Sequence, residues 1–359
     1  MRQRTVQERS MPESYLKYTG RKTLIIIILV LLTIALGIYA INAGPVELTV
    51  GEVIRTLLGK GTETSQIVIW NIRLPRVLVA IIAGAGLAVA GCVMQNILRN
   101  PLASPFTLGI SQGAAFGAAL AIVVLGAGSI QSSGADAVVI NNPYMVTVAA
   151  FISSMSATLI ILFLTKFVGI SPEAMVLAGV ALGSLFAAAT TLIQYFASDV
   201  KVAAIVFWTF GDLGRASWRE VKIMFVITII VIIYFMLHRW DYNALESGEE
   251  TAKGLGVGVE KLRVEGMLLS SLITSVAVAF MGIIGFIGLV APHMMRRIIG
   301  GDHRYLIPGA TVMGCLLLLA SDTIARMIIK PVVLPVGAIT SFMGAPLFLY
   351  LLARGAKRR

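Results

Sequence analysis

Stretches of uncharged, apolar residues long enough to cross a lipid bilayer recur along this whole chain. A helix that crosses about 30 Å of hydrocarbon needs roughly 20 such residues. With 57% hydrophobic and only 13% charged residues, the sequence is typical of an all-α, polytopic membrane protein and not of a soluble globule. Eight windows approach or reach the required length: 24–41, 77–98, 106–127, 144–165, 174–198, 223–237, 305–321 and 331–353.

A ninth apolar window, Gly266 to Met295, does not have the length of a single span. As one helix it would be about 45 Å long at roughly 1.5 Å per residue, which is too long for one crossing and short for two. The glycine-rich stretch 281–285 can supply a tight turn within it. We therefore expect two spans here, the first starting near Val259 and the second, a short one, ending near Ile299.

Basic residues at both ends of the chain predict its orientation in the membrane. The tails 1–22 and 354–359 are rich in Lys and Arg, which mark the cytoplasmic side, so both termini should be cytoplasmic. The number of spans is then even, and we expect ten, all within a transmembrane domain at 23–353. No small-residue cleavage site follows the first window, so it should be a retained span and not a signal peptide. The net charge of +11 thus reflects topology and not a nucleic-acid partner.

One long polar segment, 238–265, lies between two spans on the expected cytoplasmic side. Its sequence ALESGEETAKGLGV combines helix formers with glycine breaks, which predicts two short helices joined by a turn. Composition alone leaves two interpretations open, a solvated loop and a docking platform for a soluble partner. On the outer side we expect the segments 42–73, 126–143, 198–220 and 326–332.

Ionisable residues are absent from the middles of the expected spans, and Glu173, Asp322, Arg326 and Lys330 all lie at span ends. Ion-coupled secondary transporters usually carry a titratable group deep in a span. This class is therefore disfavoured, although it stays an alternative because unwound backbone carbonyls can bind sodium. The chain has no GxxxxGK[ST] or HExxH motif, so neither ATP binding of that kind nor enzyme activity is expected. Energy for any transport would come from a partner.

Glycine and alanine are concentrated in three stretches, 83–91, 108–120 and 177–189. Small residues four apart let membrane helices approach closely, so plain helix packing is the favoured interpretation of each stretch. Together they predict a dense bundle of many helices whose smooth faces could also line a wide path. A purely structural membrane protein fits poorly with this pattern and with the glutamate-bearing polar loop.

The segment 285–309 brings His293, Asp302 and His303 close together in the sequence. A structural metal site takes four ligands, and the neighbouring residues are mostly Met, Ile, Arg and Gly, so we expect no metal site. Instead Pro292 should interrupt the hydrogen-bond ladder of a helix. Basic residues should anchor the end of this helix at the inner membrane surface: Arg296, Arg297 and Arg304.

Several long motifs occur in an order typical of one protein family: RLPR (73–76), GAGLAVAGCVMQNILRNPLASPFTLGISQGAAFGA (84–118), NALESGEETAKGLGV (243–257), GFIGLVAPHMMRRIIGGDHRYLIPG (285–309), SDTIARM (321–327) and LPVGAITSFMGAPLFLYLL (334–352). Together they resemble the permease subunits of bacterial and archaeal ABC importers for iron-siderophores, haem and cobalamin. The resemblance implies a multi-pass subunit of the cytoplasmic membrane that pairs with a second permease copy, as a homodimer. Its other partners would be two cytoplasmic ATPase subunits, which bind ATP and Mg, and an extracytoplasmic substrate-binding protein. This subunit itself would hold no cofactor.

The resemblance also implies roles for individual residues. The segment 238–265 would be a coupling loop that docks in a groove of the ATPase. Ser247 departs from the leucine usual there. The positions that match the family's pattern are Glu246, Gly248, Glu249, Glu250, Ala252, Gly254, Leu255 and Gly256.

Arginines at the outer span ends resemble docking points for glutamates of the binding protein: Arg73, Arg76 and Arg326. From the sequence alone, snorkelling of these arginines at the membrane interface is the alternative.

The resemblance places a cytoplasmic gate at Ser171, Pro172 and Glu173, although Glu173 could instead cap the positive N-terminus of the following helix. The translocation path would be lined partly by Ala178, Gly179, Gly183 and Ser184. For the cargo we favour an iron-siderophore, with cobalamin as the close alternative and haem third. Two departures from the family's pattern, Ser104 in place of Asp and Val333 in place of Glu, leave the cargo open.

Overall fold

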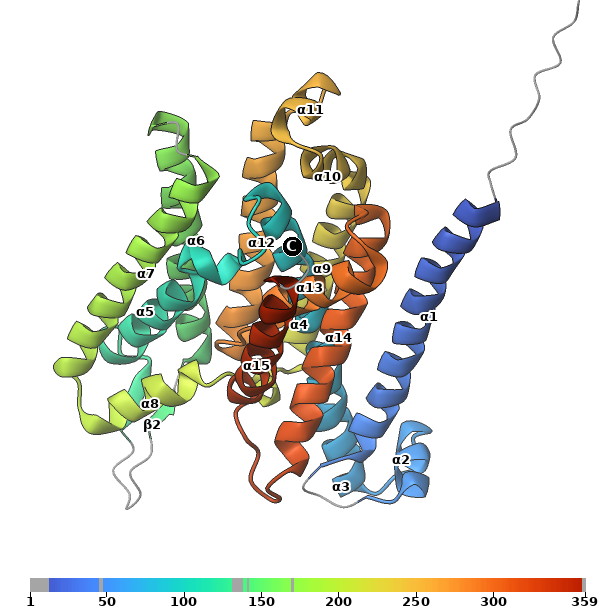
Figure 1. Ribbon diagram of the computed structural model, residues 1–359. Helices are drawn as coiled ribbons and strands as arrows, with labels where there is room; N and C mark the ends of the chain where they lie inside the picture. The colour runs from blue at the N-terminus through green and yellow to red at the C-terminus, as the bar shows by residue number, and fades with distance from the viewer. Residues whose placement is uncertain (1–12, 45–47, 131–137, 141, 169–170, 357–359) are drawn as a thin grey trace, which may run out of the picture.

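The computed structural model describes residues 13–44, 48–130, 138–140, 142–168 and 171–356. The chain forms a bundle of helices that run roughly along one common direction (Figure 1). The principal helices are α1 (Glu13–Asn42), α4 (Leu74–Ile97), α5 (Ile110–Val123), α6 (Pro143–Val168), α7 (Pro172–Tyr195), α9 (Trp218–Leu237), α12 (Val259–Met281), α13 (Ile287–Ile299), α14 (His303–Met327) and α15 (Val336–Ala356).

Short elements cover the two ends of the bundle (Figure 1). We call the two ends the α10 end and the α2 end. The α10 end holds α10 (Arg239–Glu246) and α11 (Glu249–Gly254). The α2 end holds α2 (Val50–Leu57), α3 (Glu63–Gln66), the π-helix η1 (Ile67–Arg73), α8 (Asp199–Thr209), the 3₁₀ turn η3 (Leu213–Arg215) and a small hairpin of β1 (Gly128–Ile130) and β2 (Val138–Ile140). A further 3₁₀ turn, η2 (Pro105–Leu108), precedes α5.

Every predicted window contains a helix, so the structure confirms a helical membrane protein, to which it adds the hairpin. Among the described residues, seven helices are long and apolar enough to cross a membrane, and α5 and α15 are shorter apolar helices. The count of ten spans and the cytoplasmic termini stay predictions. Helix α1 begins at Glu13, inside the predicted tail 1–22, because helix formers precede its apolar run. The predicted outer segment 198–220 contains the helix α8.

The division of the ninth window is confirmed. Helix α12 runs from Val259 to Met281 and α13 ends at Ile299, with the break at residues 282–286. Gly282 has a φ of 78°, as a turn at glycine requires, and Phe286 has a φ of 67°. Helix α13 runs through Pro292. Because proline has no N–H, the hydrogen-bond ladder of α13 lacks one bond there, although the helix itself continues to Ile299.

Helix α4 is the centre of the main core, since it is buried along nearly its whole length and packs against α9, α12, α13 and α14. Glycines bring the backbones into direct contact. A Cβ added at Gly84 would lie 2.3 Å from the carbonyl oxygen of Gly314 on α14, and one added at Gly91 would lie 1.7 Å from that of Gly288 on α13. A second core cluster lies among α5, α6, α8 and α12. There Gly117 meets the backbone of Ala149 in the same way, with 2.2 Å from its Cβ position to the oxygen.

We expect the substitution Gly91→Ala to destabilise the protein by about 1–3 kcal/mol or more, because the new methyl group must push α4 and α13 apart. Denaturant unfolding of the purified protein in detergent measures the effect. The matched control is Gly51→Ala in α2, where nothing lies within 4 Å of the added methyl group. That control should be neutral or gain up to ~1 kcal/mol. Equal unfolding midpoints for the two variants would contradict the prediction.

Candidate functional site

The polar loop at the α10 end folds as the two predicted short helices, α10 and α11. Ser247 and Gly248 join them, and Gly248 has a φ of 124°, which only glycine adopts readily. The buried side chains of Tyr242 and Leu245 on α10 and Ala252 on α11 hold the pair against the bundle. The loop is thus a fixed part of the fold and not a solvated, irregular segment.

The glutamates of this loop serve two different purposes. Glu246 accepts a bond from Arg296 on α13 (2.6 Å) and one from the amide nitrogen of Asn96 on α4 (2.9 Å). Glu249 accepts a bond from Arg263 on α12 (3.1 Å). Burial raises the pKa of Glu249, but the charge and hydrogen bond of Arg263 outweigh this and lower the pKa below its usual range. These two carboxylates therefore fasten the loop to its own bundle.

A smaller set of residues faces outward from the loop. The side chain of Glu250 is 91% exposed, and Leu255 is 69% exposed although it is apolar. Ser247, Gly254 and Gly256 are also exposed. An exposed leucine beside glycines, together with an exposed carboxylate that pairs with Lys253, forms a compact surface suited to a protein partner. We call Glu250, Gly254, Leu255 and Gly256 the loop surface.

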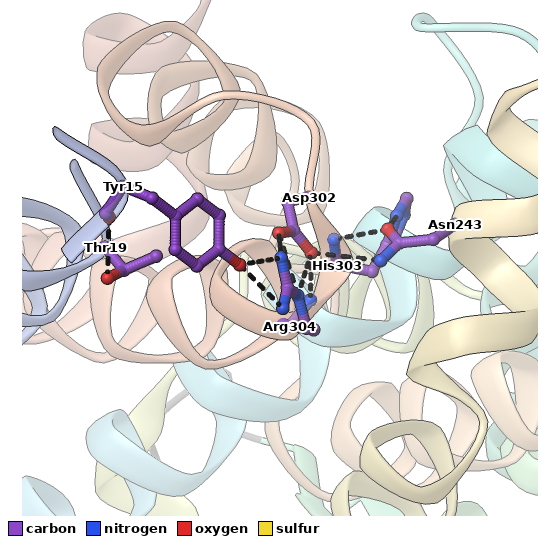
Figure 2. Close-up of polar contacts among 6 residues, drawn as sticks. All are labelled: Tyr15, Thr19, Asn243, Asp302, His303 and Arg304. Atoms are coloured by element: carbon purple, nitrogen blue, oxygen red, sulfur yellow. Dashed lines mark hydrogen bonds and ion pairs between the residues drawn. The ribbon is translucent and has the colours of Figure 1, made fainter. Parts of the chain in front are cut away.

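A polar cluster at the start of α14 contacts this loop (Figure 2). Asp302 caps α14 and accepts bonds from the backbone N–H of Arg304 (3.1 Å), from its guanidinium Nη2 (2.6 Å) and from Asn243 Nδ2 on α10 (3.0 Å). Asn243 Oδ1 accepts a bond from the backbone N–H of His303 (2.7 Å). The chemistry is that of a helix cap joined to a neighbouring helix. In the part of the chain that the structure describes, no group of three or more His, Cys, Asp or Glu side chains could hold a metal ion.

Asp302 should make part of the stability depend on pH. Burial raises its pKa, but bonds from Arg304 and Asn243 outweigh burial and lower the pKa from 3.8 to about 2. Because the folded-state pKa is the lower one, the stabilisation is complete above about pH 4 and is lost as the pH falls through about 2. The contribution is on the order of 2 kcal/mol. Unfolding free energies at several pH values for wild type and Asp302→Asn check this. A difference between them that stays constant down to roughly pH 2 would contradict it.

The three predicted docking arginines lie at the α2 end, and all three are buried. Arg76 Nε donates to Asp322 Oδ1 (2.9 Å), and Arg326 Nε forms an ion pair with Asp322 Oδ2 (2.9 Å). A second carboxylate, Asp212, lies 3.4 Å from Arg76 Nη2. Arg73 donates from Nη1 to the carbonyl oxygens of Ile41 (2.9 Å) and Asn42 (2.8 Å).

Arg326 also reaches the end of α1, where its Nη1 donates to the carbonyl oxygens of Ala40 (3.0 Å) and Ala43 (2.6 Å). These arginines therefore do not snorkel to the interface, as the alternative interpretation had it, because they bind helix ends and Asp322 inside the chain. Their docking role stays a prediction. Glutamates of a binding protein would have to compete with these internal partners.

The predicted gate residues begin α7. Ser171 Oγ accepts a bond from the backbone N–H of Ala174 (3.3 Å), so Ser171 is the cap. Glu173 is exposed in the first turn, where the helix dipole favours a carboxylate.

The predicted path residues lie on two sides of α7. Gly179 and Gly183 are buried, and a Cβ at Gly179 would meet the carbonyl oxygen of Thr107 in η2 at 2.3 Å. These two glycines therefore serve helix packing in this structure. Ser184 is exposed and Ala178 is half-buried, so these two remain candidates for lining a path.

Several residues that build the site went unnoticed in the sequence. Asn96 and Asn243 lie within the quoted motifs, but they and Arg263 were given no role, because their contacts join segments far apart in the chain. Asp322 and Arg326 are four residues apart on one helix, a spacing that favours an ion pair and could have revealed the internal cluster.

A densely packed membrane bundle that carries a rigid two-helix loop at one end is typical of a membrane transport subunit. The family comparison makes this specific. A sequence model of the FecCD transport family matches residues 30–354, and the chain belongs to that family.

Individual relatives agree with this assignment. The chain is 57% identical to a protein of Methanocaldococcus jannaschii that carries the name of an ABC transporter permease, over 97% of this chain and 99% of the relative. It is 38% identical to the hemin transport system permease protein of Yersinia pestis, over 92% and 96%. A solved structure described as an inward-facing conformation of a metal-chelate type ABC transporter superposes with a TM-score of 0.80 at 30% identity, over 92% and 99% of the two chains. The chain is thus an ABC importer permease, a multi-pass membrane protein of a family of transport subunits and not of enzymes.

Proposed function

We propose that this permease moves an iron chelate, with an iron-siderophore as the favoured cargo, by alternating access in a homodimer. The observation that carries the ATP-driven part is the loop surface, because it presents an exposed leucine and carboxylate on helices that are fastened to the bundle. Relatives named for hemin, Fe(3+)-citrate and vitamin B12 support a metal chelate as the cargo. Cobalamin and haem are the alternative cargoes.

Three partner surfaces follow from this proposal. The ATPase subunits, which would bind ATP and Mg, dock on the loop surface at the cytoplasmic side. The binding protein docks at the α2 end, next to the arginine cluster, which is our name for Arg73, Arg76, Arg326 and Asp322. The second permease copy covers exposed apolar side chains of α7 and α15, such as Leu185 and Phe342, which would otherwise face lipid.

Transport then proceeds as a rigid-body movement. When two ATPase subunits close on ATP, they displace α10 and α11, and the bonds of Glu246 and Glu249 pass this displacement to α4, α12 and α13. Residues at the start of α7, including Ser171, Pro172 and Glu173, would open or close the inner mouth. Ala178 and Ser184 would face the moving cargo with few specific contacts.

Reconstitution tests the proposal. The permease is placed in liposomes with its cognate ATPase and binding protein, and uptake of a ferric siderophore, cobalamin and hemin is measured with and without internal ATP. We expect ATP-dependent uptake, with the ferric siderophore preferred. Uptake without the ATPase, driven by a proton or sodium gradient, would show an ion-coupled secondary transporter and overturn the proposal.

A further inference from the structure

Asn243 on α10 makes side-chain hydrogen bonds that join the coupling loop to α14. Two ring contacts lie beside them: the Arg304 guanidinium is 4.8 Å from the centre of the Trp240 ring, and the rings of Tyr242 and His303 are 6.0 Å apart. Asn243 Nδ2 donates to Asp302 Oδ1 (3.0 Å), and Asn243 Oδ1 accepts from the backbone N–H of His303 (2.7 Å; Figure 2). The ring nitrogen Nδ1 of His303 lies 3.1 Å from the same oxygen. A side-chain amide has a donor and an acceptor on one rigid plane, so it can bind both groups of the α14 cap at once.

Helix α14 connects the two ends of the bundle. At its start lie Asp302 and Arg304, and near its end lie Asp322 and Arg326 in the buried arginine cluster. It is also fastened to α1 at both ends, because Arg304 donates to Tyr15 Oη (3.4 Å) and Arg326 donates to the carbonyl oxygens at the end of α1. Helices α1 and α14 are therefore held as one two-helix unit.

The chain itself does not link this unit to the coupling loop directly. Helix α10 follows α9 and α11 precedes α12, so backbone connections carry a displacement of the loop to α9 and α12. The 56 residues 247–302 separate the end of α10 from the start of α14. A displacement of α10 reaches the first turn of α14 through side chains. Asn243 makes the hydrogen bonds among them, and Trp240 and Tyr242 add ring contacts.

We propose that Asn243 is a positioning residue that makes α14, with α1, follow the ATPase-driven displacement of α10. The inference rests on the proposed function, because it needs an ATPase that moves the loop. It assigns to α14 the task of carrying that displacement to the arginine cluster at the α2 end, where a binding protein would sit.

Exchanging the amide and the carboxylate between positions 243 and 302 tests the contact of Asn243 with Asp302. Asn243→Asp places two carboxylates against each other. Asp302→Asn removes the negative charge and one of the two oxygens that accept bonds from the Arg304 side chain. Together they restore an amide and a carboxylate with exchanged positions, so the pair can form its bond again. A coupling between the two substitutions beyond their separate effects isolates the contact itself. Asn243→Ala removes both bonds, and Thr311→Ala, which removes a hydroxyl bonded to Ile307 O of the same helix (2.8 Å), is the control.

The first readout is uptake per ATP hydrolysed in liposomes with the cognate ATPase and binding protein, with ferric siderophore as the probe. We expect Asn243→Ala and Asn243→Asp to lower this ratio by ~10-fold while ATP hydrolysis stays within about twofold, because two bonds to a largely buried cap are lost. The exchanged pair should recover most of the ratio, and Thr311→Ala should match wild type. An unchanged ratio in Asn243→Ala, or no recovery in the exchanged pair, would overturn the inference.

A second readout needs no cargo. Spin labels at Ser247→Cys on the loop and Ile328→Cys at the end of α14, with the buried Cys92 and Cys315 changed to serine, report the distance across the unit. With the ATPase bound, this distance should be the same without nucleotide and after trapping with ATP and vanadate. In Asn243→Ala it should differ between the two states. If the distance changes as much in wild type as in Asn243→Ala, the inference is wrong. If the wild-type permease binds no ATPase, the proposed function is wrong instead.

Discussion

Replacing Asp322 with alanine should destabilise the protein by about 3–5 kcal/mol, because it removes the carboxylate paired with buried Arg326 and leaves buried Arg76 with only the more distant Asp212. Asp322 is fully buried and lies within 2.9 Å of both Arg76 Nε and Arg326 Nε. Neither arginine can turn to water without breaking the packing of α4 against α14. Chemical unfolding in detergent gives the free energy, and the yield of folded protein in the membrane should fall with it.

The control for this prediction is Asp199→Ala, which removes an exposed carboxylate from the first turn of α8 at the same end of the bundle. It should cost less than ~1 kcal/mol. Asp322→Asn keeps the shape and one acceptor, so it should fall between the two. If Asp322→Ala unfolds at the same denaturant concentration as Asp199→Ala, the buried cluster does not hold the α2 end together.

The second large effect is expected at the loop surface. Leu255→Asp should weaken binding of the ATPase subunit by at least ~30-fold, because a central apolar anchor of an interface contributes about 2 kcal/mol or more. The leucine is 69% exposed and makes little contact with its own chain, so the fold and its stability should not change. Binding of the purified ATPase to the permease in detergent or nanodiscs gives the dissociation constant directly.

Leu58→Asp is the matched control, since Leu58 is 71% exposed and lies beside α2 at the other end of the bundle. This variant should bind the ATPase as wild type does. Glu250→Ala, at the same loop, should have a smaller effect of about 0.2–1 kcal/mol, because an exposed ion pair contributes little. Equal ATPase affinity for Leu255→Asp and Leu58→Asp would remove Leu255 from the docking surface.

The sequence predicted the helices well because hydrophobic runs and glycine breaks are local signals. The windows, the break at 282–286 and the two short helices of 238–265 all followed from residues close together in the chain. The elements α2, α3 and α8 went unpredicted because they are short and partly polar, so their pattern resembles that of a loop. The hairpin likewise lies in a segment whose glycines and serines indicate only a turn.

Side-chain direction was the part that sequence patterns could not supply. In a sequence, Arg76 and Arg326 look the same whether their side chains point to a partner protein or into the bundle. The structure shows that they point into the bundle, where both pair with Asp322. Glu246 and Glu250 differ by four positions, yet one holds Arg296 and the other faces away from the bundle. Similarly, Gly179 was expected at a path surface but packs on η2, because small residues suit both places.

The glycine contacts of α4 have a consequence for how the bundle can deform. Ordinary helix interfaces tolerate small shear because long side chains change rotamer as the helices slide. At Gly84 with Gly314, and at Gly91 with Gly288, backbone meets backbone, and no side chain is present to absorb a shift. Helices α13 and α14 can therefore tilt about these contact points, but they cannot slide along α4 unless the backbones first move apart.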